Sequence, residues 1–186
     1  MNAHAASDRG RFVANAVGSV VFFWVAPGTL AGYLPWLITR WRMRPALLDL
    51  GAGRWLGAAL FAAGLVALVE CFARFVTEGS GTPAPVAPPR HLVVKGLYAY
   101  VRNPMYVAVV TVVLGQALWF GSARLLEYTG LVWLGFIVFV TLYEEPTLHR
   151  TFGAAYKEYC ANVPRWWPRF SPWRVPAPGP PRPPRR

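Results

Sequence analysis

PMYVAVVTVVLGQALWF at residues 104–120 and LLEYTGLVWLGFIVFVTLY at residues 125–143 are two apolar runs separated by only four residues. A helix that crosses a membrane needs about 20 such residues. The second run meets this requirement, whereas the first would be about 26 Å long as a helix and needs its flanks to reach both membrane surfaces. The two runs therefore predict a pair of membrane-spanning helices.

Two further apolar runs precede this pair, at roughly 12–38 and 55–76. The first contains Pro27-Gly28 near its middle and Pro35 near its end, which favours a kinked single span and leaves a broken or re-entrant helix open. No small-residue cleavage site follows a compact apolar core, so we expect this run to stay as an anchor. The sequence thus predicts about four transmembrane helices.

Composition agrees with a membrane protein. The chain has 186 residues, of which 55% are hydrophobic, and a formal net charge of +11. A soluble domain of this length could not bury so much apolar surface. The basic residues lie between the apolar runs, as expected for loops that touch lipid headgroups, and form no continuous face for a nucleic acid. We predict an all-α integral membrane protein whose first partner is the lipid bilayer. The oligomeric state stays open.

The loops indicate an orientation. With the N-terminus inside, fourteen of the nineteen Lys and Arg residues lie inside, as the positive-inside rule favours, although the cluster TRWRMR at 39–44 then lies outside. We expect the protein to lie in the cytoplasmic membrane, with its functional site facing the cytoplasm. Two spans separate the 77–103 loop from the segment after Tyr143, so parity puts both on the same face.

Three regions are expected along the chain. Residues 1–89 hold the N-terminal membrane helices and a Pro/Gly-rich connector, residues 90–170 hold the core, and residues 171–186 form a disordered Pro/Arg tail. Within the core, 147–162 predicts a C-terminal amphipathic helix. Its apolar stripe consists of Leu148, Phe152, Ala155, Tyr156, Tyr159 and Val163.

Two polar groups flank the spans at 104–120 and 125–143. Asn103 and Pro104 predict a helix start, because Asn can cap free N–H groups and Pro fits the first turn. With Arg102 beside it, this start suits a carboxylate or phosphate, and the alternative is an ordinary inside-facing cation. Glu144 and Glu145 lie at the end of the span at 125–143 and repel each other, so they need a cation, such as Arg102 or a ligand group. A solvated interfacial pair is the alternative.

Other polar residues give weaker signals. Glu70, near the end of the apolar run at 55–76, either faces a cavity or extends its carboxylate to the membrane interface. Gln116 is expected to hydrogen-bond a neighbouring helix rather than a ligand. Cys71 and Cys160 offer neither a disulfide framework nor the spacing of a metal site.

The polar residues of the core follow one another in a family-like order. The elements are Gly96 and Tyr98, Arg102-Asn103-Pro104-Met105-Tyr106, Glu144-Glu145, Phe152-Gly153 with Tyr156 and Tyr159, and Val163-Pro164. This ordered set, over about 90–168, resembles the C-terminal core of the isoprenylcysteine carboxyl methyltransferase family, which takes in related phospholipid methyltransferases.

The resemblance implies S-adenosylmethionine as the methyl donor and a lipophilic, membrane-embedded acceptor. The implied cofactor-binding residues are His91, Leu92, Val93, Tyr98, Asn103, Pro104, Met105 and Tyr106. The implied catalytic residues are Arg102, Glu144 and Glu145. Methyl transfer is an in-line displacement that needs chiefly orientation and a dry site.

The chain departs from the family pattern at two positions. Asn103 stands where the motif usually has His, and Asn162 stands where the eukaryotic members carry Arg before Val-Pro. Arg165 in the tail could take the place of that Arg. These departures put a prenylated cysteine acceptor in doubt. They also keep an alternative open, namely a non-catalytic membrane scaffold or accessory protein that retains the family core.

Overall fold

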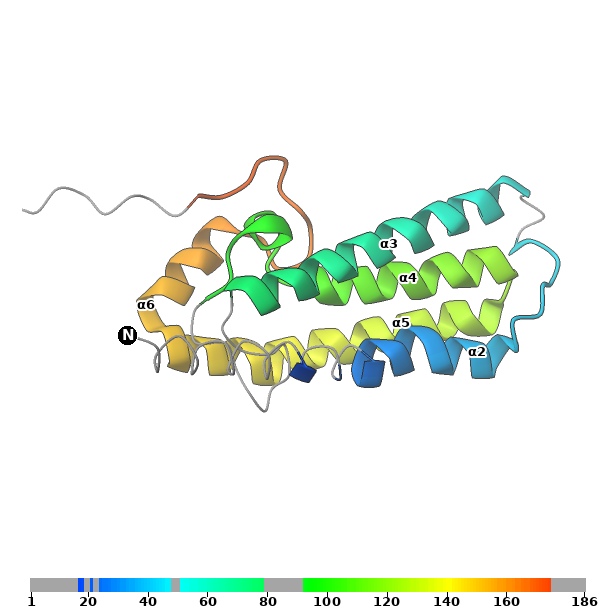
Figure 1. Cartoon of the computed structure of the whole chain (residues 1–186), viewed down its shortest axis with the longest axis horizontal. Coiled ribbons are helices and arrows are strands. Elements are labelled where there is room, and N and C mark those ends of the chain that lie inside the picture. The colour runs from blue at the N-terminus through cyan, green and yellow to red at the C-terminus, as the bar shows by residue number, and fades with distance from the viewer. Residues whose placement is uncertain (1–16, 19–20, 22–23, 48–50, 79–91, 175–186) are drawn as a thin grey trace, which may run out of the picture.

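The computed structural model describes residues 17–18, 21, 24–47, 51–78 and 92–174, and within these ranges every regular element is a helix (Figure 1). The elements are η1 (Thr29–Tyr33), α2 (Leu34–Thr39), α3 (Gly51–Glu78), η3 (Gly96–Ala99), α4 (Pro104–Phe120), α5 (Ala123–Phe139), η4 (Val140–Glu144) and α6 (Glu145–Asn162). The expected connector after Glu78, the Pro/Arg tail from 175 and most of 12–23 lie outside the described residues.

Glycines let α3 and α4 approach closely. A Cβ atom on Gly57 would lie 2.7 Å from the Gly115 carbonyl oxygen, and one on Gly64 would lie 2.9 Å from the Val112 backbone nitrogen. Small residues at such contacts allow the van der Waals packing that holds helices together where lipid gives no hydrophobic drive. These positions therefore fix α3 against the middle of the bundle.

A two-residue turn joins α4 to α5. Gly121 ends α4 in the left-handed region, with φ of 64°, and a side chain there would collide with the Pro45 carbonyl. Ser122 then caps α5, because its hydroxyl accepts a hydrogen bond from Leu125 N at 3.3 Å. This Gly-Ser pair makes the helices antiparallel neighbours.

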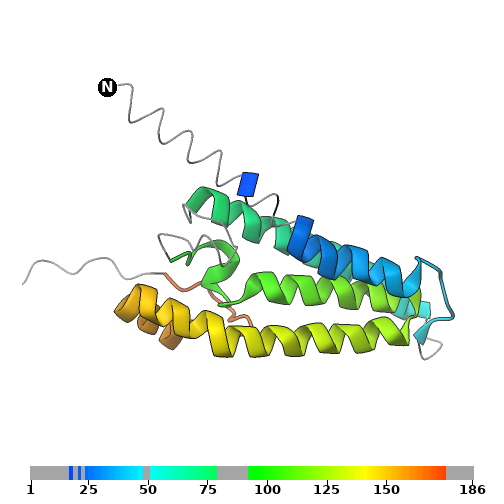
Figure 2. The same ribbon diagram turned by 90° about the horizontal axis from the view of Figure 1, so that it is seen from below.

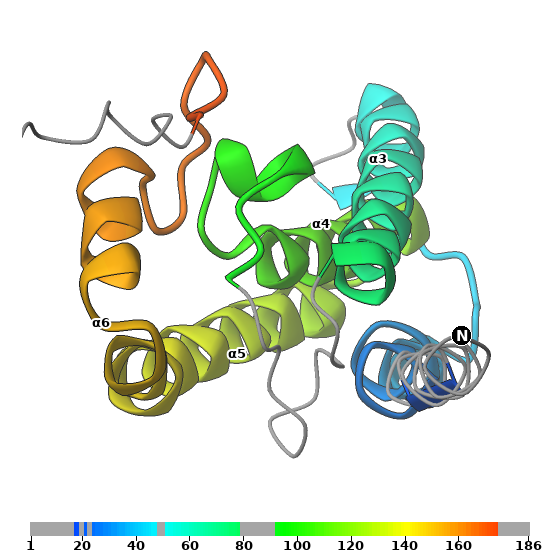
Figure 3. The same ribbon diagram turned by 60° about the vertical axis from the view of Figure 1, so that its left-hand side comes forward.

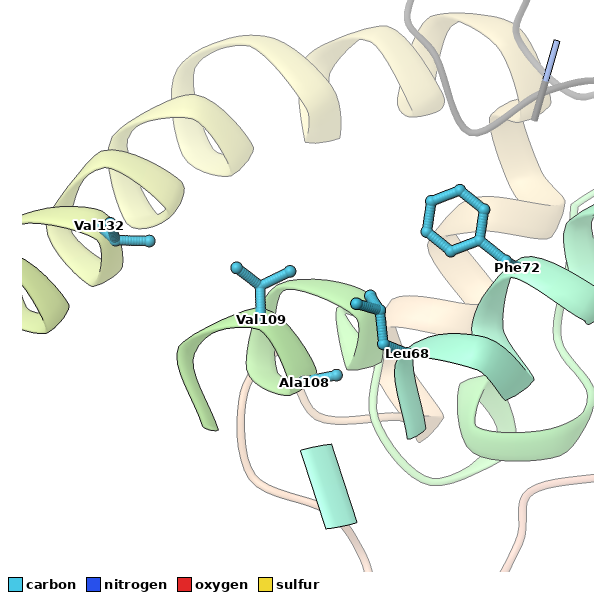
Figure 4. Close-up of a cluster of buried hydrophobic side chains, with 5 residues drawn as sticks. All are labelled: Leu68, Phe72, Ala108, Val109 and Val132. Carbon is cyan, nitrogen blue, oxygen red and sulfur yellow. The ribbon is translucent and has the colours of Figure 1, made fainter. Parts of the chain in front are cut away.

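The core lies along α4, between α3 and α5 (Figure 4). Leu68 and Phe72 come from α3, Ala108 and Val109 from α4, and Val132 from α5. Burial of these side chains explains why α4 can be almost wholly apolar, since two other helices cover it.

The helix that precedes α3 packs on α4 and α5 (Figures 2 and 3). The chain is helical from Trp24 to Thr39, with the π turn of η1 directly after Pro27-Gly28. The carbonyls of Leu30 and Ala31 accept hydrogen bonds from the Tyr128 hydroxyl at 2.9 Å and from the Gln116 amide at 2.7 Å. The described part is thus one continuous helix that contains a π turn, and the expected helix-to-helix bond of Gln116 is confirmed.

Helix α5 continues through η4 into α6, which then bends away from the bundle (Figure 3). Gly153 lies at the bend, with φ of 52° and ψ of −120°. Only glycine adopts such a conformation readily. The bend brings the second half of α6 back toward the loop before α4.

Two helices, at Gly51–Arg74 and Ala123–Asn162, are long and apolar enough to cross a membrane, and α4 is a shorter apolar helix. Their outward faces carry large apolar side chains, since Val66 of α3 is 70% exposed and Leu131 of α5 is 68% exposed. Such faces suit lipid rather than water.

Candidate active site

The loop before α4 is pressed against the end of α3. Gly96 begins η3 with φ of 60°, and a side chain there would overlap the Glu70 carboxylate. Glu70 itself pairs with Arg74 at 2.9 Å, so its charge is compensated within α3. Tyr98 of η3 is buried, and its pKa lies well above the ordinary value because of burial and the neighbouring Cys71. The glycine therefore allows η3 to dock.

The segment after α6 closes over the same loop through backbone hydrogen bonds. Arg102 N donates to Pro164 O at 2.9 Å, Arg169 N donates to Tyr100 O at 3.0 Å, and Trp173 N donates to Ala99 O at 2.9 Å. The Tyr159 hydroxyl of α6 adds a bond of 2.7 Å to Tyr98 O. The loop and the segment after α6 thus lie at the same end of the bundle, as parity predicted, and they are also in direct contact.

A carboxylate between two guanidinium groups lies at the centre of this contact. Glu145 accepts two hydrogen bonds from Arg165, at 2.9 and 2.7 Å, and pairs with Arg102 at 3.2 Å. Hydrogen bonding to Glu145 raises the pKa of Arg165 above its ordinary value. The Glu145 side chain is only 12% exposed, so water screens these attractions little. We call Arg102, Glu145 and Arg165 the charged cluster.

Arg102 has capacity for a further partner. Its Nη1 contacts both Glu145 and Cys160 Sγ. Within the described residues, its Nε is buried and has no hydrogen-bond partner. A buried N–H that lacks an acceptor is costly, so this atom suits an anionic ligand group.

Glu144 has a different partner from its neighbour Glu145. The Tyr106 hydroxyl of α4 donates a hydrogen bond of 2.6 Å to Glu144 Oε2. The Tyr106 ring packs on Phe136 of α5, with ring centroids 4.7 Å apart. The two successive carboxylates, which would repel each other on an isolated helix end, are thus each bound to a separate donor.

An apolar cavity of about 570 Å³ lies next to this tyrosine, between the 24–39 helix, α4 and α5. Its walls include Pro27, Leu30, Met105, Tyr106, Tyr128 and Phe136. Its volume falls in the range of small-molecule sites. Tyr106 therefore lines the apolar cavity and also reaches the Glu144 carboxylate through its hydroxyl.

The implied cofactor residues do not all share one surface. Leu92 packs on the cluster of Tyr156, Tyr159 and Val163, whereas Val93 packs with Cys71 and Tyr98. Met105 and Tyr106 line the cavity, and Pro104 is buried in the first turn of α4. His91 lies outside the described residues.

The prediction that the Asn103 side chain caps α4 is wrong. Asn103 occupies the cap position but makes no side-chain hydrogen bond to the helix. Its amide instead donates to Arg165 O at 3.1 Å, because the segment after α6 lies directly against it. The side chain at this position thus fastens the tail to the start of α4.

Sequence reasoning missed most of the cavity. Leu30, Tyr128 and Phe136 lie inside apolar runs, where lipid-facing and cavity-facing side chains look alike. Pro27-Gly28 was the available signal, because Pro and Gly interrupt a regular span and the π turns that accompany such interruptions are frequent at functional sites.

Comparison with known proteins gives one family. The family model described as phospholipid methyltransferase matches residues 52–155, more than half of the chain. No curated protein and no solved structure matches the chain. The matched range includes Arg102, Tyr106 and both carboxylates and ends before Arg165. The chain belongs to the phospholipid methyltransferase family.

Proposed function

We propose that this protein transfers a methyl group from S-adenosylmethionine to a lipophilic acceptor that reaches the site from within the membrane. The family consists of methyltransferases and suggests membrane lipids as substrates. The observation that carries the proposal is the double position of Tyr106, whose ring lines an apolar cavity while its hydroxyl binds Glu144. A site of this kind has a polar side for the donor and an apolar side for the acceptor.

The donor side is the region around Arg102. When bound, S-adenosylmethionine supplies an electrophilic methyl group on a sulfonium. Arg102 Nε, buried and without a partner among the described residues, suits its carboxylate, and Glu144 suits its ammonium or hydroxyl groups. The remaining proposed contacts are His91, Leu92, Val93, Tyr98, Asn103, Pro104, Met105 and Tyr106.

The packing of the loop limits what its side chains can contribute. Because Val93 and Tyr98 are buried in contact with Cys71, we assign their role toward the donor to the backbone of the loop. Glu145 is held by two arginines, so its role is to fix Arg102 and the segment after α6. Orientation of this kind is the main requirement of methyl transfer.

The acceptor side is the apolar cavity. Its walls offer few polar groups, so they suit an acyl or prenyl chain better than a soluble metabolite. An acceptor that reacts as a neutral amine or alcohol must lose a proton, and we assign Glu144 as the acceptor of that proton because Glu144 is hydrogen-bonded to Tyr106 of the cavity wall. An acceptor that is already anionic needs no such step.

We propose four membrane spans, formed by the N-terminal helix, α3, α4 and the α5–η4 helix, with α6 as an amphipathic helix at the surface. Burial of Tyr156 and Tyr159 with exposure of Lys157 and Glu158 supports this role for α6. The excess of basic residues on the loops of the site end supports the cytoplasmic face of the cytoplasmic membrane.

Donor binding tests the proposal, measured by titration calorimetry of the full chain in detergent with S-adenosylmethionine. We expect binding by the wild type and about tenfold weaker binding by Arg102→Gln. In parallel, mass spectrometry of lipids from expressing cells should show a species that gains one methyl group. Absence of both donor binding and a methylated lipid would overturn the proposal in favour of a non-catalytic membrane scaffold.

A further inference from the structure

The end of the bundle opposite the charged cluster collects cations that the methyl-transfer site does not use. The end of α2, the start of α3 and the α4–α5 turn meet there, at the right of Figure 1. The arginines of this end are Arg40, Arg42, Arg44, Arg54 and Arg124. None of the five pairs with an acidic side chain among the described residues.

The turn after α2 carries Arg40, Arg42 and Arg44 on a backbone that is held in place. Arg40 and Trp41 both have left-handed backbone conformations, with φ of 49° and 52°, which non-glycine residues adopt only where surrounding contacts enforce it. The Thr39 hydroxyl accepts a hydrogen bond from Trp41 N at 3.1 Å, and Arg44 N donates to Phe120 O at 3.0 Å. The turn is thus anchored to the end of α4.

A second apolar cavity, of about 420 Å³, adjoins this turn. It lies between the α2 region, α3 and α4, and its walls include Trp41, Phe61, Gln116 and Trp119. The Gln116 amide already donates to Ala31 O, so the wall offers mainly apolar surface. Trp41 lies between two arginines in the sequence and also lines the cavity, so the cavity reaches the arginine turn.

We propose that this end binds one anionic glycerophospholipid, with its phosphate among Arg40, Arg42 and Arg44 and one acyl chain in the cavity. Guanidinium groups bind phosphate well, and Trp side chains suit the interface between headgroup and chain. Arg40 stacks on the Trp36 ring, 4.5 Å from its centroid, but this contact brings no negative charge. A neutral lipid could fill the cavity but would leave the charge of the arginines uncompensated. An anionic phospholipid satisfies the charge and the apolar surface together.

Native mass spectrometry of the full chain in detergent tests this inference with phosphatidylglycerol and phosphatidylcholine as probes. The variant Arg40→Gln/Arg42→Gln/Arg44→Gln removes three positive charges from the turn. We expect it to bind phosphatidylglycerol about tenfold more weakly than the wild type and to bind phosphatidylcholine equally. The matched control is Arg150→Gln/Lys157→Gln/Arg174→Gln, which removes three exposed charges at the other end and should bind like the wild type.

A second variant tests the cavity without altering the arginines. Ala58 lines the cavity, so Ala58→Phe should fill it and weaken phosphatidylglycerol binding several-fold. The two triple variants and Ala58→Phe should all keep S-adenosylmethionine binding, which also shows that they are folded. Equal binding of the two lipids by the wild type would overturn the inference. Full competition by glycerol phosphate, or loss of binding in the control triple variant alone, would overturn it as well.

Discussion

The two ends of the helical bundle both carry arginines, but their arginines have opposite surroundings. At the site end, Arg102 and Arg165 share the largely buried carboxylate of Glu145. At the opposite end, Arg42 and Arg44 lie exposed on a turn, without an acidic partner among the described residues.

The difference shows what each end is suited for. Paired and buried charges give a rigid frame, because loss of one partner leaves the other desolvated and uncompensated. Exposed cations cost little in free energy and remain available for a charged group from the membrane. The site end therefore carries fixed geometry for chemistry, and the opposite end carries capacity for a lipid headgroup.

The largest effect is expected from the centre of the charged cluster. Glu145→Gln leaves two guanidinium groups without their carboxylate, so we expect the unfolding free energy to fall by about 3 kcal/mol and methyl transfer to fall about 100-fold through misplacement of Arg102. Thermal unfolding in detergent and a methyl-transfer assay measure the two. Glu158→Gln, exposed on the same helix, is the control and should change neither. Equal behaviour of the two variants would show that the cluster has no structural role.

The next effect concerns the link between the polar site and the cavity. Tyr106→Phe keeps the ring against Phe136 but removes the hydroxyl that binds Glu144, so methyl transfer should fall at least about tenfold with little change in folding. Tyr143→Phe removes a half-exposed hydroxyl nearby and serves as the control. Unchanged activity in Tyr106→Phe would exclude a role for the Tyr106–Glu144 bond.

A smaller effect is expected in the acceptor cavity. Gly135 lines it and has open space around its Cβ position, so Gly135→Leu should occupy the cavity and raise the KM for the lipid acceptor about tenfold while leaving donor binding unchanged. Gly130 on the same helix also has open space but does not line the cavity, so Gly130→Leu is a matched control. A parallel rise of KM in both variants would mean that the acceptor binds elsewhere.

The smallest effect is expected at the opposite end. Arg124→Gln removes an exposed charge without an acidic partner in the described structure, so the midpoint of thermal unfolding should move by no more than about 2 °C. Methyl transfer should stay within about twofold of the wild type. Destabilisation comparable to that of Glu145→Gln would abolish the contrast between the two ends.

The sequence predicted the helices better than the contacts among them. Residues 104–120 predict α4 to the residue, because Asn103-Pro104 and Gly121 mark its ends. The run 55–76 predicts α3 within a few residues at each end. Apolar length and start or stop residues are local properties, so one sequence is enough to read them.

Span parity put Arg102 on the same face as Glu144 and Glu145 and made it a candidate partner, but it did not indicate which carboxylate Arg102 would bind. Glu144 is the last residue of the π turn η4 and Glu145 follows it, so the turn shifts the direction of these side chains. The hydrogen bond from Asn103 to Arg165 O and the two hydrogen bonds from Arg165 to Glu145 depend on how the segment after α6 packs against the loop before α4. Those contacts arise from tertiary packing, which no local pattern encodes.

Transfer of a labelled methyl group from S-adenosylmethionine to the lipid phase, by the full chain in nanodiscs, tests the central claim of a shared donor and acceptor site most directly. We expect label in a membrane lipid with the wild type and with Gly130→Leu, about 100-fold less label with Glu145→Gln and at least about tenfold less with Tyr106→Phe. Absence of label with every lipid extract, or equal labelling by Glu145→Gln and the wild type, would contradict the claim.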